Sequence, residues 1–291
     1  MHTKYFDAAV SILLALFLTA CGGGAVRTTE TVPVEVSSPT ETSPSILTQS
    51  GVSLAEVNTQ AAIPTNTAPQ VNNTGCLPEG SRNKTISVLL VGNSLMNAIQ
   101  PRVEELLTCG GYTPEMATSN PGGYTLERHT TNQQTANLIA QGYDLTLLQE
   151  HSGGIVNHAR PYETINTLKN KIESAGSKMG FYQTWEYQER DPVVTESILA
   201  GYESVAGHFG APNIAIGRAW DFFYTSNNES PPFELFADYA HTTEYGQAMI
   251  AYVLYAYLTG DSPVYLSSLS LKDDEAFMLQ TIAWDTYQAH R

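Results

Sequence analysis

The sequence predicts an α/β fold in which helices cover both faces of a parallel sheet. The first observation is the apolar segment 85–91, where Val88, Leu89, Leu90 and Val91 follow one another without alternation. Such a run is typical of a strand buried on both faces. The second is that strand-like and helix-like segments alternate from this point to the carboxyl end, which favours parallel strands joined by right-handed crossovers. One domain of about 210 residues fits this pattern better than two.

The remaining elements follow in chain order. After the strand at 85–91, a helix is expected to begin at Pro101 and to end at Gly110 and Gly111, because proline suits the first helical turn and glycine the end. Four more strands are expected at 112–118, 144–149, 179–185 and 213–216, which makes a sheet of about five. The other helices are expected at 126–141, 161–175, 193–209, 244–258 and 272–290.

Composition and charge narrow the class of protein. The chain has 291 residues, 42% of them hydrophobic, which is ample for a globular core. Its formal net charge is -15. Because a surface of this sign repels phosphate backbones, the charge argues against a nucleic-acid partner.

The amino terminus is expected to be an export signal rather than part of the fold. Lys4 precedes an apolar run, residues 8–20, that is too short to span a bilayer. The run ends in LTAC at 18–21, which resembles the bacterial lipobox, in which the cysteine is lipidated after cleavage. We therefore expect a lipoprotein signal peptide at 1–20, a lipid anchor at Cys21 and location in the bacterial cell envelope; the alternative is an ordinary secretory signal. Gly22 after the cysteine favours the outer membrane if the cell is Gram-negative.

Residues 21–80 are expected to form a disordered tether. The segment is rich in Ser, Thr and Pro, and no aromatic residue occurs between Phe17 and Tyr112. Such a composition buries too little apolar surface to offset the entropy lost on ordering. The folded domain is therefore expected at 81–291.

Two cysteines remain after Cys21 is assigned to the lipid. They are Cys76 and Cys109, and they bracket the first strand and helix. In an exported protein a disulfide between them is expected; two free thiols are the alternative.

Two short motifs carry the candidate chemistry. Ser94 follows Gly92 and Asn93 directly after the first strand, at the sheet edge where ligands bind in open α/β folds. Asp238 and His241, spaced as Asp-x-x-His, precede the long apolar helix. A serine hydroxyl needs a base within reach, and that base needs a group that fixes its tautomer. Each motif alone has a plainer interpretation, since Gly-Asn-Ser is also a common turn and Asp238 can cap the following helix.

Taken together, the motifs resemble the SGNH hydrolase superfamily, also called GDSL esterases. The resemblance covers about residues 85–258 and rests on GNS at 92–94, GGYTLERH at 122–129, LLQEHS at 147–152, QTW at 183–185 and DYAHTTEYGQ at 238–247. It is nearer to a subset of bacterial SGNH proteins than to the well-studied lipases. The resemblance implies a three-layer, flavodoxin-like α/β/α fold and hydrolysis of acyl esters without a metal ion or cofactor.

Carried over by position, the resemblance makes Ser94 the nucleophile, His241 the base and Asp238 its orienting acid. The backbone N–H groups of Ser94 and Gly123 would form the oxyanion hole. Gly122 is the alternative position for the second donor.

The chain departs from the family pattern at two places. The residue before the serine is Asn93, where the family usually has Asp, and the Gly-x-Asn-Asp block after the third strand is absent. The Asn of that block normally donates a third hydrogen bond to the oxyanion. Gln149 is the expected replacement because its amide is chemically equivalent, and Ser152 is the second choice.

Other polar and aromatic residues have plainer interpretations. The histidines have no metal-site spacing and are expected on the surface or in loops; these are His129, His151, His158 and His208. The acidic cluster Glu186, Glu189 and Asp191 is expected to be a solvated loop, although paired carboxylates also serve glycosidases. Trp185 is expected either to line a pocket or to pack in the core.

The sequence thus predicts an exported, lipid-anchored serine esterase that removes small acyl groups, above all acetyl, from carbohydrate. The expected partners are a small acyl ester or acylated carbohydrate and, through Cys21, the membrane. Two alternatives remain open: a lipase or thioesterase of the same fold, and a catalytically silent binding lipoprotein.

Overall fold

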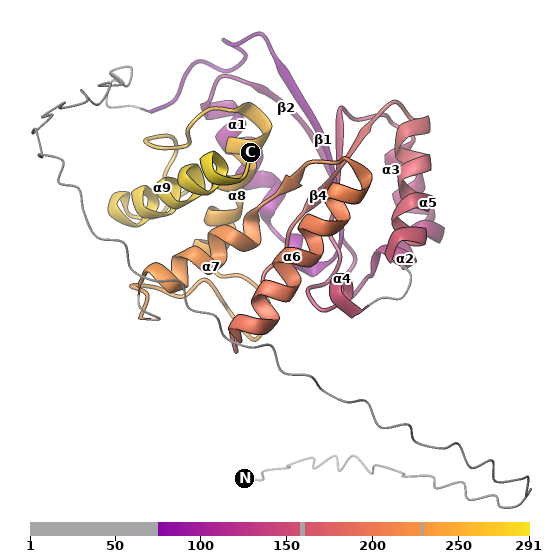
Figure 1. The fold of residues 1–291 in the computed structure, drawn as a ribbon. Helices are drawn as coiled ribbons and strands as arrows, with labels where there is room; N and C mark the ends of the chain where they lie inside the picture. The colour runs from indigo at the N-terminus through magenta and orange to yellow at the C-terminus, as the bar shows by residue number, and fades with distance from the viewer. Residues whose placement is uncertain (1–74, 158–160, 228–229) are drawn as a thin grey trace, which may run out of the picture. The chain divides into compact units, whose positions relative to one another are not determined.

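The computed structural model describes residues 75–157, 161–227 and 230–291 (Figure 1). The signal peptide, Cys21, most of the tether and His158 lie outside the described residues. Among the helices in the described part of the chain, none is both long and apolar enough to cross a membrane.

Five parallel strands form one sheet in the order β2-β1-β3-β4-β5. The strands are β1 (Thr85–Val91), β2 (Thr113–Ser119), β3 (Leu145–Leu148), β4 (Lys178–Tyr182) and β5 (Asn213–Ile214). Every neighbouring pair is parallel. This order is the flavodoxin-like one, in which the strand order reverses beside β1 and ligands bind outside the carboxyl ends of the strands.

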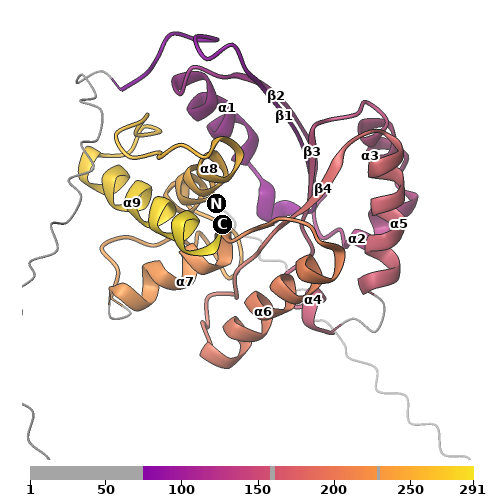
Figure 2. The same cartoon turned by 45° about the horizontal axis from the view of Figure 1, so that its top comes forward.

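Helices cover the sheet on both faces, which confirms the predicted three-layer architecture (Figures 1 and 2). One face packs on α1 (Ile99–Cys109), α7 (Ile216–Ser226), α8 (Glu244–Thr259) and α9 (Asp273–His290). The other face packs on α2 (Leu126–Thr131), α3 (Gln133–Ile139), α5 (Pro161–Ser174) and α6 (Pro192–Phe209), with α4 (Gly154–Asn157) beside them.

Strand β1 has the predicted bounds and the predicted burial on both faces. Val88 and Leu90 belong to the core on the α8 side, whereas Leu89 and Val91 belong to the core on the α5 side. The unbroken apolar run therefore follows from burial between two helical layers.

Several boundaries differ from the prediction for local reasons. The predicted helix at 126–141 is two helices, because Asn132 leaves the helical conformation and its side chain accepts a hydrogen bond from the N–H of Thr135, which starts α3. Helix α1 begins at Ile99, ahead of Pro101. Helix α7 was not predicted; it follows β5 directly and buries Trp220 and Phe223.

The structure contains the expected disulfide between Cys76 and Cys109, with their Cα atoms 4.3 Å apart. The backbone N–H of Leu77 also donates to the carbonyl of Cys109 at 2.8 Å. The bridge ties the segment before β1 to the end of α1. By the chain-entropy model, closing a loop of this length stabilises the fold by about 3–4 kcal/mol.

Candidate active site

The residues of the two motifs meet at the carboxyl edge of the sheet, beyond the end of β1. The first residue past the strand, Gly92, still belongs to the ladder, because its N–H donates to the carbonyl of Ser119 at 2.9 Å. The chain then turns, with Asn93 as the N-cap of a short 3₁₀ turn that runs from Ser94 to Met96. Ser94 is partly exposed and Asn93 is buried. The turn therefore presents only the serine to solvent.

Ser94, His241 and Asp238 form a hydrogen-bonded chain. His241 Nε2 lies 2.9 Å from Ser94 Oγ. The other ring nitrogen, Nδ1, lies 2.9 Å from Asp238 Oδ2 and 3.1 Å from Oδ1. With a carboxylate on Nδ1, the neutral imidazole carries its proton there and turns an unprotonated Nε2 toward the hydroxyl. This is the arrangement in which a histidine can take a proton from serine.

Asp238 is held by its own turn. Its Oδ1 accepts hydrogen bonds from the backbone N–H groups of Ala240 at 2.9 Å and His241 at 2.8 Å. These N–H groups, first that of His241 and then that of Ala240, together with the His241 ring, lower the pKa of the Asp238 carboxyl to about 2. The carboxylate is therefore charged at neutral pH, and its side chain is 59% exposed.

The turn is fixed by its two ends. Phe236 and Thr242 form an antiparallel bridge, and the N–H of Ala237 donates to the carbonyl of His241 at 2.8 Å. Helix α8 is capped by Thr243, whose hydroxyl accepts from the N–H of Gly246 at 3.3 Å. Thr243 therefore caps α8, and Asp238 binds His241.

The serine turn and the loop at Gly122 and Gly123 offer free backbone donors. Among the described residues, the N–H groups of Ser94, Gly122 and Gly123 have no hydrogen-bond acceptor. Gly123 lies in the left-handed region, with φ of 68°, and both it and Gly122 are exposed. Its loop is tied to the serine turn, because Asn93 Nδ2 donates to the carbonyl of Tyr124 at 3.0 Å.

Gln149 does not occupy the position expected of a third oxyanion donor. Its side chain is fully buried. Its Oε1 accepts from the backbone N–H of Asn93 at 2.8 Å, and its Nε2 donates to the carbonyl of Glu150 at 2.7 Å. Both ends of the amide are therefore hydrogen-bonded to backbone groups, and a substrate oxygen cannot reach it. Ser152, the second choice, is also fully buried.

His129 is a residue of this site that sequence reasoning placed on the surface. It is only 1% exposed and lies beneath the serine turn. Its Nε2 donates to the carbonyl of Gly92 at 2.7 Å, and its Nδ1 lies 2.8 Å from the hydroxyl of Thr135. Burial lowers the pKa of His129, against a smaller opposing effect of the bond to Gly92. The spacing of Leu126 and His129, three residues apart on one helical face, was the available signal for burial.

The other described residues singled out in the sequence form no part of the hydrogen-bonded chain of Ser94, His241 and Asp238. Trp185 is buried and stacks on Trp220 with ring centroids 4.2 Å apart, so it packs in the core. Glu186 is also buried, where it accepts from the hydroxyl of Thr195 at 2.9 Å, and burial raises its pKa. His208 packs edge-on against Tyr162. Within the described part of the chain, no group of three potential ligands is arranged to hold a metal ion.

An exposed tyrosine lies on the same turn as the acid and the base. Tyr239 follows Asp238 directly and is 54% exposed. Its ring lies 4.9 Å from that of Tyr187, which belongs to the loop after β4. The backbone N–H of Gln188 donates to the carbonyl of Tyr239 at 3.0 Å and holds the two loops together. The pair forms an aromatic surface beside the hydrogen-bonded chain.

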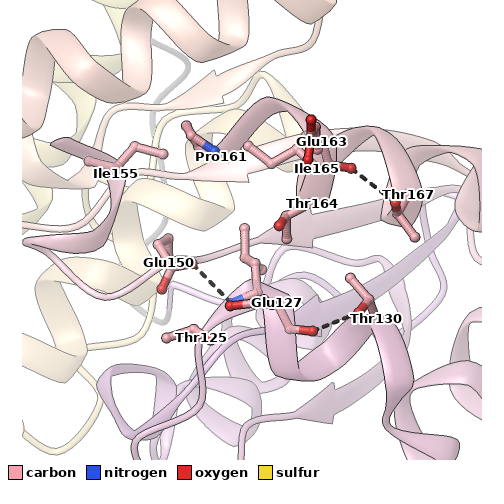
Figure 3. Close-up of a pocket in the computed structure, with 11 residues that line it drawn as sticks. Thr125, Glu127, Thr130, Glu150, Ile155, Pro161, Glu163, Thr164, Ile165 and Thr167 are labelled. Carbon is pink, nitrogen blue, oxygen red and sulfur yellow. Dashed lines mark hydrogen bonds between the residues drawn. The ribbon is translucent and has the colours of Figure 1, made fainter. Parts of the chain in front are cut away.

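A separate cavity of about 440 Å³ opens between α2 and α5 (Figure 3). Glu127 and Thr130 line it from α2, and Glu163 and Thr167 line it from α5. None of Ser94, Asp238 and His241 lines it. The chemistry of the site therefore lies at the open edge of the sheet and not in this cavity.

Comparison with known proteins supports the fold. No family model matches the chain, and no curated protein matches it either. A solved structure of a DUF4886 family protein from Bacteroides uniformis superposes on 70% of this chain and 95% of its own, with a TM-score of 0.62 and 19% identity. The two proteins share one fold.

More distant structures are similar over smaller parts of the chain. An acetyl xylan esterase is matched over 58% of this chain and 98% of its own, at a TM-score of 0.46 and 14% identity. A member of the lipolytic G-D-S-L family from Veillonella parvula is matched over 59% and 96%, at a TM-score of 0.41 and 14% identity. TM-scores below 0.5 at 14% identity do not establish a shared fold or function. With its flavodoxin-like sheet, the chain has the fold that its resemblance to the SGNH hydrolases implies.

Proposed function

We propose that the chain is an extracytoplasmic serine esterase of SGNH type that hydrolyses small acyl esters. The observation that carries this proposal is the 2.9 Å contact between Ser94 Oγ and His241 Nε2, with the Asp238 carboxylate on the opposite ring nitrogen. A serine, a histidine and a carboxylate in this order suit acyl transfer and need no metal ion.

In the acylation step, His241 Nε2 takes the proton of Ser94 as Oγ bonds to the acyl carbon. The electron pair of the carbonyl moves onto its oxygen, which faces the N–H groups of Ser94 and Gly123. His241 then gives its proton to the oxygen of the alcohol, and the bond between that oxygen and the acyl carbon breaks. A water molecule repeats the sequence on the acyl-enzyme, releases the acid and restores Ser94.

The proposal is tested with the chain from residue 75 onward, a series of aryl esters of increasing acyl length, and a fluorophosphonate. Wild-type protein should hydrolyse aryl acetate and should gain one phosphonyl group on Ser94. Ser94→Ala should lack both properties while keeping the wild-type melting temperature. Folded wild-type protein that neither hydrolyses any of the esters nor reacts with the fluorophosphonate would contradict the proposal.

We propose that the acyl group is small, with acetyl the first choice, and that the alcohol is carbohydrate. The pair formed by exposed Tyr239 and half-buried Tyr187 beside the acid turn supports the carbohydrate half of the proposal, because aromatic faces can pack against the apolar faces of sugar rings. Tyr239→Ala should raise KM for an acetylated oligosaccharide and leave aryl acetate turnover unchanged. Tyr265→Ala is the matched control, since Tyr265 is 63% exposed and pairs with Phe277 on α9, in another part of the chain.

We further propose that the enzyme is exported and anchored in the bacterial cell envelope by lipid on Cys21. The support is the LTAC motif after the short apolar run. A clickable fatty acid fed to expressing cells should label the wild type and not Cys21→Ser. Equal labelling of the two proteins would exclude this anchor.

A lipoprotein that binds a ligand without catalysis is the second candidate. Both ends of the Gln149 amide are hydrogen-bonded to the backbone, so Gln149 offers the oxyanion no third donor. Loss of one donor costs about 10²–10³ in rate in a well-studied serine protease. An inert wild type in the ester assay would favour this second function. Turnover that Ser94→Ala abolishes would exclude it.

A further inference from the structure

We propose that Gln149 and His129 are positioning residues that clamp the turn carrying Ser94 and so set the direction of its N–H. The inference rests on the proposed esterase function. Neither residue touches a substrate, since both are buried. They act through Gly92 and Asn93, the two residues that join β1 to the serine.

Gln149 holds the turn from the side of β3. Its backbone N–H donates to the carbonyl of Val91 at 2.8 Å, which extends the pairing of β3 with β1 past its last regular residue. Its Oε1 then accepts the N–H of Asn93 at 2.8 Å. This approach requires glycine at 92, because a Cβ at that position would clash with Oε1 of Gln149. The Gly-Asn-Ser turn and Gln149 are therefore complementary in shape.

His129 holds the turn from the side of α2. The carbonyl of Gly92 has no proton to give, so His129 Nε2 carries one and donates it. The neutral ring then accepts at Nδ1 from the hydroxyl of Thr135, which lies nearer to it, at 2.8 Å, than to Asn132 Oδ1, at 3.2 Å. The Thr135 oxygen also lies 2.9 Å from that of Ser119, whose hydroxyl can donate to it. Because burial lowers the pKa of His129, the ring stays neutral at pH 7, and the carbonyl of Gly92 keeps its one proton on Nε2.

The two contacts leave Gly92 and Asn93 without a free polar group. The N–H of Gly92 binds Ser119, its carbonyl binds His129, and the N–H of Asn93 binds Gln149. The side chain of Asn93 accepts from the N–H of Leu95 at 3.1 Å and donates to the carbonyl of Tyr124. Since Tyr124 adjoins Gly123, the clamp also fixes the spacing between the two N–H groups offered to the oxyanion.

The consequence is that the clamp acts on the rate of the chemical step more than on binding. Stabilisation of an oxyanion needs donors held in place before the reaction begins. A misplacement of about 1 Å can cost roughly 100-fold in rate. Gln149, which was expected to replace the third donor, thus contributes by holding the first donor rather than by reaching the substrate.

Gln149→Met tests the clamp because it keeps the length of the side chain and loses both hydrogen bonds. We expect kcat for aryl acetate to fall about 10- to 100-fold, with KM changed less than about twofold. Thr146→Val is the matched control: Thr146 lies on β3, the strand that Gln149 follows, is fully buried and shares a 2.9 Å hydrogen bond with Ser177. It should lower the melting temperature by a similar amount and leave kcat unchanged.

The pair His129→Gln and His129→Leu separates positioning from packing. A glutamine amide can still donate to the carbonyl of Gly92, whereas leucine cannot. His129→Gln should therefore keep most of the wild-type kcat, and His129→Leu should lose about 10- to 100-fold at the same KM. Nitrogen-15 NMR of the wild type should show His129 as the neutral Nε2–H tautomer at pH 7.

The outcomes distinguish this inference from the function on which it rests. An active wild type in which Gln149→Met and His129→Leu keep full kcat would overturn the clamp and leave the esterase proposal intact. If Gln149→Met does not fold, the two His129 variants decide the question. An Nδ1–H tautomer for His129 would also overturn the clamp, whether or not the protein hydrolyses esters.

Discussion

The two halves of the candidate site are built in opposite ways. The nucleophile half is buried, and Gly92 and Asn93 are held by side chains from two distant segments, Gln149 after β3 and His129 on α2. The acid–base half is exposed, with the His241 side chain 47% accessible, and Asp238 is held by backbone N–H groups two and three residues further on. One half depends on the tertiary fold, and the other depends mainly on its own turn.

The two halves are therefore sensitive to different mutations. A change in the core can move the serine turn, because its partners are 37 and 56 residues away in sequence. The acid turn keeps its local hydrogen bonds as long as its two ends stay joined by the bridge between Phe236 and Thr242. We expect mutations in the two halves to differ in how much they lower turnover, in how much they lower stability and in how that stability depends on pH.

The largest effect should come from the atoms that exchange the proton. Ser94→Ala and His241→Ala should each lower ester turnover by several orders of magnitude, and the double variant should be scarcely worse, because triad members act as a unit. Steady-state kinetics of the three proteins on aryl acetate checks this. If the double variant loses as much turnover as the product of the two single losses, the two residues do not act in one step.

Asp238→Asn should cost less, about 10³–10⁴-fold in kcat. The asparagine oxygen can still accept the backbone N–H groups of Ala240 and His241, but its NH₂ group then faces the ring and favours the wrong tautomer. Because the turn keeps its local bonds, the melting temperature should stay near that of the wild type. A large loss of stability in this variant would contradict the view that the turn is held by its own backbone.

Asn93→Asp tests the buried half with a change of a single functional group. The carboxylate can still accept from the N–H of Leu95, but it repels the carbonyl of Tyr124, to which Asn93 donates. We expect a loss of about 1–3 kcal/mol in the free energy of unfolding, measured by chemical denaturation, together with a lower kcat. Asn120→Asp is the matched control, because Asn120 makes an exposed hydrogen bond to Asn97. Equal stabilities for the two variants would contradict a specific role for the buried amide.

The same contrast explains which parts the sequence could predict. Strand β1 and the Asp-x-x-His turn were predicted because their signals are local: an unbroken apolar run in one case, and two side chains on one turn in the other. The contacts of Gln149 and His129 with the serine turn were missed because nothing near either residue in the sequence reveals a partner across the sheet. Gln149 was expected to face the substrate because its amide can donate a hydrogen bond. The fold instead directs that amide to backbone groups. The break between α2 and α3 was missed because it depends on the cap at Asn132.

The smallest effect should be on the pH dependence of stability, and it should separate the two halves. Burial lowers the pKa of His129 from its ordinary value of 6.5, so the unfolded chain binds a proton there that the folded chain does not. Stability is therefore fully present above about pH 6.5 and falls as the pH drops below it, by at most about 1.4 kcal/mol per pH unit from this group.

Asp238, whose pKa is lowered from 3.8 to about 2, acts in a separate and more acidic window: its contribution is present above about pH 4 and lost as the pH falls toward 2. Denaturant midpoints measured between pH 8 and 5 should therefore fall less steeply in His129→Gln than in the wild type. Those of Asp238→Asn should run parallel to the wild type over the same range. Parallel curves for His129→Gln and the wild type would show that His129 does not remain neutral beneath the serine turn.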